Sequence, residues 1–118
     1  MTYQEIRSKF NMPQQELADL LGIPRRTIQN WDEGITTCRQ YLVDLIAYRL
    51  ENDDFTPFEP AYYTMKELRL ATGMYQKDFA EYFGFSVGIL RNWESNQSYS
   101  KYLLNLMEYK LFKENIIN

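Results

Sequence analysis

The chain has 118 residues, of which 45% are hydrophobic and 25% charged, with only five Gly and four Pro; this is the composition of a folded globular protein rather than of a linker. The length fits one compact domain or two very small ones. There is no histidine and only one cysteine, Cys38, which excludes an internal disulfide, a Cys/His zinc site and every His-dependent catalytic dyad or triad. We therefore expect no enzyme, no metal and no other cofactor.

The net charge of −3 is distributed unevenly along the chain. Lys and Arg number 6 against 7 acidic residues for positions 1–52, 0 against 3 for 53–63, and 7 against 6 for 64–118. No apolar run approaches the ~18 residues that a membrane span needs, and the polar N-terminal residues do not resemble a signal peptide. We expect a cytoplasmic protein that has no membrane partner.

The first 52 residues contain the signals of four short helices. "TYQE" at residues 2–5 is a Thr-x-x-Glu capping box, which predicts that a helix begins at Tyr3, and Asn11 tolerates the left-handed backbone that ends it. A second helix is predicted over residues 14–21, ended by Gly22, and a third carries the phrase "RRTIQNWDEG" at residues 25–34. The loop "GITTCRQ" follows, where Cys38 is expected to be a small, part-buried residue. A fourth helix in "RQYLVDLIAYRLEN" has apolar residues at positions 41, 42, 45, 46 and 48.

Residues 53–63, an acidic and proline-broken stretch, are predicted to connect these helices to a second copy of the same unit. The second unit spans residues 64–118 and repeats the pattern. Its first helix begins at the capping box "TMKE" and ends at Gly73, and its second covers residues 76–83 and ends at Gly84. The phrase "VGILRNWESN" forms the third helix, and the last lies in "SKYLLNLMEYKLFKEN", with apolar residues at 102, 103, 106, 107 and 109. Nine pairs are identical when Thr2 is set against Thr64: Thr2/Thr64, Glu5/Glu67, Arg7/Arg69, Met12/Met74, Gln14/Gln76, Ala18/Ala80, Gly22/Gly84, Asn30/Asn92 and Trp31/Trp93. One structural unit is therefore used twice.

The second and third helices of each unit share a packing pattern. It consists of Leu17, Ala18, Leu21, Gly22, Ile23, Ile28 and Trp31, and of Phe79, Ala80, Phe83, Gly84, Phe85, Leu90 and Trp93. A small Ala lets two helices cross closely, Gly takes the tight turn between them, and the apolar positions set the angle of the third helix. Both copies resemble the phage-repressor and Cro type of helix-turn-helix, the XRE-like family. The resemblance implies an all-α protein of two tandem four-helix helix-turn-helix units with a lambda-repressor-like DNA-binding fold.

The predicted third helix has one polar face and one apolar face. At about 100° per residue, Arg25, Arg26, Gln29 and Asn30 share the polar face, while Ile28 and Trp31 point the other way. These polar side chains can pair with guanine, adenine or phosphate in the DNA major groove. The resemblance implies that this helix enters the groove and that the Gln opening the preceding helix bonds a phosphate. The predicted DNA-binding residues are Gln14, Arg25, Arg26, Thr27, Gln29, Asn30, Gln76, Arg91 and Asn92.

The two copies differ at the start of the third helix. Val87, Gly88 and Ile89 stand where the first copy has Arg25, Arg26 and Thr27, which leaves Arg91 as the one charged reader of the second copy. We expect both Trp residues to be core anchors, and we expect Asp32, Glu33 and Glu94 to form a solvated helix end.

These patterns favour a transcriptional regulator, such as a repressor, that binds double-stranded DNA sequence-specifically. Its two units would act as a covalent pseudo-dimer, with unit 1 as the main reader of bases. The chain would be a monomer or a homodimer. The alternative is a protein-interaction module of the antitoxin or phage-inhibitor type. The acidic balance and the aromatic residues of the second copy, Tyr62, Tyr63, Tyr75, Tyr82 and Tyr99, support it, and unit 2 could then hold a protein partner.

Overall fold

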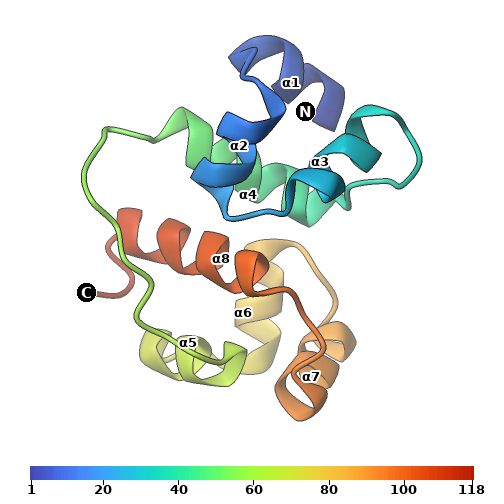
Figure 1. Cartoon of the computed structure of the whole chain (residues 1–118). Coiled ribbons are helices and arrows are strands. Elements are labelled where there is room, and N and C mark those ends of the chain that lie inside the picture. The colour runs from blue at the N-terminus through green and yellow to red at the C-terminus, as the bar shows by residue number, and fades with distance from the viewer. The chain divides into compact units, whose positions relative to one another are not determined.

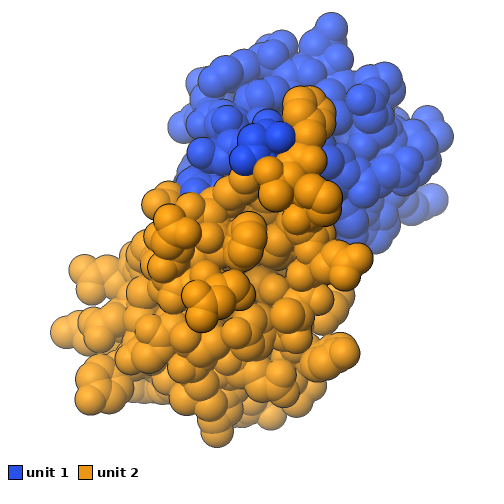
Figure 2. All heavy atoms as spheres, turned by 90° about the vertical axis from the view of Figure 1, so that its left-hand side faces the viewer, with its two compact units in different colours: residues 1–54 blue, residues 55–118 orange.

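The computed structural model describes all 118 residues and contains eight helices and no strand (Figure 1). The expected all-α class is confirmed. The chain divides into two compact units, Met1–Asp54 and Phe55–Asn118, which Figure 2 shows in different colours. The division falls within the stretch 53–63 that was interpreted as a connector.

Unit 1 contains four helices, α1 (Tyr3–Phe10), α2 (Gln14–Leu21), α3 (Arg25–Asp32) and α4 (Gln40–Glu51). Its core is formed by apolar side chains that recur at helical spacing, among them Ile6, Leu17, Ile28 and Ile46, each at most 2% exposed. Trp31 is 6% exposed and its ring meets that of Tyr3 edge to face, with centroids 5.5 Å apart. Trp31 is therefore a core anchor, as expected.

Unit 2 repeats this order with α5 (Met65–Thr72), α6 (Gln76–Phe83), α7 (Val87–Asn96) and α8 (Lys101–Lys113). Its core is richer in aromatic side chains than that of unit 1. Trp93 is 8% exposed and lies edge to face against Phe85, with centroids 4.9 Å apart, so it too is an anchor. The third helix of this unit extends to Asn96, whereas α3 ends at Asp32.

The helix starts and stops follow local chemistry. The hydroxyls of Thr2 and Thr64 each accept a hydrogen bond of 3.1 Å from the backbone N–H three residues later. A capping-box Glu ordinarily accepts from the backbone N–H of the cap residue, but in unit 2 the Glu67 carboxylate accepts instead from the N–H of Tyr63, one residue earlier, at 3.4 Å. Asn11 and Gly73 end the first helices with left-handed backbone, at φ 31° and 76°, as predicted.

The last helix of unit 2 is buried over more of its surface than its apolar stripe predicted. Besides that stripe, Leu104, Leu111 and Glu108 are buried, and Glu108 is only 3% exposed. The Glu108 carboxylate accepts hydrogen bonds from the backbone N–H groups of Ala61 at 2.7 Å and Tyr62 at 3.2 Å. This clamp satisfies a charge that would otherwise be costly to bury.

Aromatic contacts also hold the segment before α5 against α8. The Phe58 ring packs against Tyr109 and Phe112, with centroids 5.2 Å and 5.7 Å apart. The Lys101 ammonium also donates to the carbonyl of Tyr62 at 3.3 Å. The second half of the predicted connector therefore lies on α8 as part of unit 2.

None of the eight helices combines the length and the apolar character needed to cross a membrane.

Candidate functional site

The second and third helices of each unit are joined by a tight glycine turn. Gly22 adopts φ 69° and Gly84 φ 79°, a left-handed conformation that glycine adopts without steric cost. The small side chains of Ala18 and Ala80, 4% and 2% exposed, lie on the buried side of the second helix. In both units the second helix packs directly against the third. The structure thus brings together the elements of the packing pattern seen in the sequence.

The exposed face of α3 carries the residues predicted to bind DNA in unit 1. Arg25, Arg26 and Gln29 are exposed, and Thr27 and Asn30 are partly exposed. Ile28 is fully buried and faces away from them. The ion pairs of this unit involve Arg7, Lys9 and Arg49, so the two arginines that open α3 belong to none of them.

The corresponding face of α7 has a different character. Gly88, Ile89, Arg91 and Asn92 are exposed and Val87 is partly exposed. Arg91 is turned toward the preceding helix, where its Nε donates to Gln76 Oε1 at 3.4 Å. The second face therefore offers one cation, one amide and three small or apolar residues.

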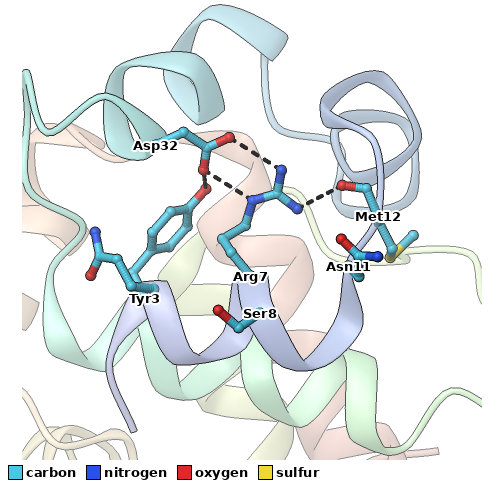
Figure 3. Close-up of a pocket in the computed structure, with 7 residues that line it drawn as sticks. Tyr3, Arg7, Ser8, Asn11, Met12 and Asp32 are labelled. Carbon is cyan, nitrogen blue, oxygen red and sulfur yellow. Dashed lines mark hydrogen bonds and ion pairs between the residues drawn. The ribbon is translucent and has the colours of Figure 1, made fainter.

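Gln14 is held by a network of polar side chains beside α3. Its Nε2 donates to Asp32 Oδ2 at 2.9 Å. Arg7 binds the same carboxylate at two points, with Nε 3.0 Å from Oδ1 and Nη2 3.1 Å from Oδ2, and Tyr3 donates its hydroxyl to Oδ1 at 2.8 Å (Figure 3). Since the remaining Nη1 of Arg7 donates to the carbonyl of Met12 at 2.8 Å, one guanidinium joins α1, the turn before α2 and the end of α3.

Unit 2 repeats this network with a longer acid. Arg69 binds Glu94 at two points, at 2.7 Å and 3.0 Å, and donates to the carbonyl of Met74 at 3.0 Å. Gln76 Nε2 donates to Glu94 Oε1 at 3.2 Å. The expectation that Asp32 and Glu94 form a solvated helix end was therefore wrong, whereas Glu33 is exposed as expected.

The networks change the proton affinities of their members. Burial of the Asp32 carboxyl opposes ionisation, but the hydrogen bonds from Arg7, Gln14 and Tyr3 outweigh it, so the pKa of Asp32 lies below its ordinary value. Likewise, burial of the Glu94 carboxyl is outweighed by the bonds from Arg69 and Gln76, which lower the pKa of Glu94. Burial and the hydrogen bond to Asp32 raise the pKa of Tyr3. Both acids are therefore charged and paired near neutral pH.

The Arg–acid pairs could have been found by comparing the two copies. Arg7 and Arg69 are identical in register, and an acid follows the identical Trp in each copy. The Arg7 pair lies at the wall of a cavity of about 360 Å³, lined by Tyr3, Gln4, Arg7, Ser8, Asn11, Met12 and Asp32 (Figure 3). Tyr3, Arg7 and Asp32 of the network form part of the cavity wall, and each guanidinium nitrogen of Arg7 already donates a hydrogen bond.

Cys38 is buried rather than part-buried, and burial raises the pKa of its thiol to about 12. A thiol that remains protonated at neutral pH is a poor nucleophile.

The chain matches no protein-family model, and neither a curated protein nor a solved structure shows significant similarity to it.

Proposed function

We propose that the protein is a sequence-specific transcriptional regulator that binds double-stranded DNA through two helix-turn-helix units acting as a covalent pseudo-dimer, with unit 1 as the main base reader. The observation that carries this proposal is the exposed polar face of α3, where Arg25, Arg26 and Gln29 lie opposite the buried Ile28 and Trp31. A helix with a reading face of this kind fits the major groove of B-DNA.

The side chains on this face match the hydrogen-bonding groups of base edges. Arginine pairs at two points with guanine O6 and N7, and glutamine or asparagine with adenine N6 and N7. A good pair of this kind contributes about 1 to 3 kcal/mol of discrimination against the wrong base. Arg25 and Arg26 stand at the first two positions of α3, so we assign base readout to them.

Gln14 and Gln76 are suited to bind the phosphate backbone. Each side-chain amide nitrogen has two hydrogens, and one is already directed to Asp32 or Glu94. The paired acid thereby fixes the orientation of the amide, and the second hydrogen remains for a phosphate oxygen. The network contributes to binding by positioning the glutamine before DNA arrives.

The acidic balance of the chain is compatible with this role because two of the nearest acids are neutralised. Asp32 and Glu94 lie at the end of the third helices, and each is paired with an arginine at two points. Glu33, which caps the C-terminal end of α3, is the acid there that stays exposed. At the end of α3, phosphate repulsion therefore comes from Glu33 rather than from Asp32.

Selection from random-sequence double-stranded DNA tests the proposal. We expect the full chain to enrich a motif of two unequal half-sites. The double variant Arg25→Ala/Arg26→Ala should enrich no motif at one of them, whereas Lys9→Ala, which removes a charge from α1, should return the same motif. Failure of the wild-type chain to enrich any motif would overturn the proposal.

A second function, binding of a protein partner through unit 2, is favoured by one observation. Tyr63 and Tyr75 are each 80% exposed and Leu70 is 59% exposed, which is unusual for large side chains on one small unit. The other tyrosines that suggested this alternative in the sequence, Tyr62, Tyr82 and Tyr99, are partly buried. This alternative predicts that Tyr63→Ser/Tyr75→Ser leaves the selected DNA motif unchanged and abolishes co-purification of a protein partner.

A further inference from the structure

The first turn of α7 presents an apolar notch to solvent. It consists of Val87, Gly88 and Ile89, where Val87 is partly exposed, Ile89 is 37% exposed and Gly88 is exposed. Successive residues of a helix lie about 100° apart, so the glycine falls between the two branched side chains on the helix surface. In unit 1 the same positions hold Arg25, Arg26 and Thr27.

The fold itself does not require a glycine at position 88. A Cβ added there would meet only the Ser86 hydroxyl oxygen, at 3.9 Å, which is ordinary van der Waals contact. The residue lies within a helix, where glycine is less favourable than alanine because it loses more backbone entropy on folding. No neighbour in the chain occupies the space beside Gly88, and this space is open to solvent.

The polar surroundings of the notch indicate what kind of group that is. The exposed Arg91, one turn further along α7, is oriented by its bond of 3.4 Å to Gln76. Glu94, about one turn beyond Arg91 on α7, is 6% exposed at its side chain and paired with Arg69. The notch is thus apolar with an unopposed cation beside it, which suits a partner that is apolar at one point and anionic next to it.

We propose that the notch of Val87, Gly88 and Ile89 accepts the 5-methyl group of a thymine in the major groove, with Arg91 on the adjacent backbone phosphate. The thymine methyl is the one apolar group that a base pair shows in this groove, and the phosphate backbone supplies the anion. This inference rests on the proposed DNA-binding function and assigns an A·T pair to the half-site of unit 2. The two units then read by different chemistry, unit 1 by arginine hydrogen bonds and unit 2 by shape and apolar contact.

The test replaces each thymine of the selected site by deoxyuridine, one at a time, which removes only the methyl group. Burying one methyl contributes about a fourfold change in affinity. We expect one or two thymines in one half-site whose replacement weakens wild-type binding about fourfold. In the Val87→Ala variant the same replacements should weaken binding less than twofold, because the thymine methyl has lost its contact with Val87.

Gly88→Ala separates the contact from the stability of the fold. The new methyl fills the notch without an internal clash, so the melting temperature should not fall, while affinity for the thymine site should drop toward that for the deoxyuridine site. Leu70→Ala, which shortens another exposed apolar side chain of unit 2, is the matched control and should leave every deoxyuridine effect unchanged.

The outcomes distinguish the two proposals. If a motif is selected but no thymine shows a loss that depends on Val87, the notch does not read a methyl group and the DNA-binding function stands. If no motif is selected at all, both proposals are overturned.

Discussion

Arg69 and Glu94, 25 positions apart, form a two-point ion pair in which Nε lies 2.7 Å from Oε2 and Nη2 lies 3.0 Å from Oε1. Arg7 and Asp32 are related in the same way in unit 1. In both units the third donor of the guanidinium binds the backbone carbonyl just before the second helix. The pair therefore fixes three helices around the residues that we assign to DNA contact.

Removing the arginine of this pair should destabilise the protein. Arg69→Ala leaves the Glu94 carboxylate, 6% exposed, without its main partner, and we expect a loss of about 3 kcal/mol in unfolding free energy. Arg69→Lys keeps the charge but cannot reproduce the planar two-point geometry, so it should recover only part of the loss. Urea denaturation measures both, with Lys77→Ala, an exposed cation of the neighbouring helix α6, as the control. A loss for Arg69→Ala no larger than the control's would show that the pair is dispensable.

The same pairs predict a loss of stability in acid. Because the pKa values of Asp32 and Glu94 are lowered in the folded state, the native chain binds fewer protons than the unfolded chain between the folded and unfolded pKa values. Their stabilisation is complete above the unfolded values of about 4 and is lost as pH falls through the folded values. Urea midpoints between pH 2 and 6 should fall less steeply for Asp32→Asn/Glu94→Gln than for the wild type. Equal slopes would mean that other carboxyl groups control acid unfolding.

Glu108 should hold the segment before α5 in place. Glu108→Gln replaces one accepting oxygen by an amide that cannot accept from Ala61 or Tyr62 N–H, and an unsatisfied buried group costs about 1 to 3 kcal/mol. We expect faster hydrogen exchange at these two amides and a lower melting temperature. Glu59→Gln, an exposed acid in the same segment, should change neither. Unchanged protection in Glu108→Gln would show that the Phe58 contacts alone are sufficient.

The helix boundaries could be predicted because their signals are local. Thr2 and Thr64 cap their helices through a hydrogen bond that spans three residues, and Gly22 and Gly84 end theirs by a backbone conformation that needs no tertiary partner. The burial of Glu108 could not be predicted in this way. Its partners are backbone N–H groups 46 and 47 positions away, which give no side-chain signal in the sequence.

The candidate site was predictable to a similar degree. The exposed face of α3 follows from periodicity, since Ile28 and Trp31 must point inward. The pairing of Asp32 with Arg7 was missed because an acid at a helix end is most often solvated, and only contact with α1 changes that expectation. Nothing in a single helix reveals such a contact.

We propose that unit 1 reads bases and that Arg91 of unit 2 binds the backbone, and DNA binding by single variants across salt concentrations separates these two roles. Affinities for the selected site and for scrambled DNA would be measured for wild type, Arg25→Ala, Arg26→Ala and Arg91→Ala. We predict that each unit 1 variant brings the two affinities together, with a loss of about 1 to 3 kcal/mol on the selected site alone. Arg91→Ala should weaken both DNAs about equally and reduce the salt slope by about one. A larger loss of specificity in Arg91→Ala than in both unit 1 variants would show that unit 1 is not the main base reader.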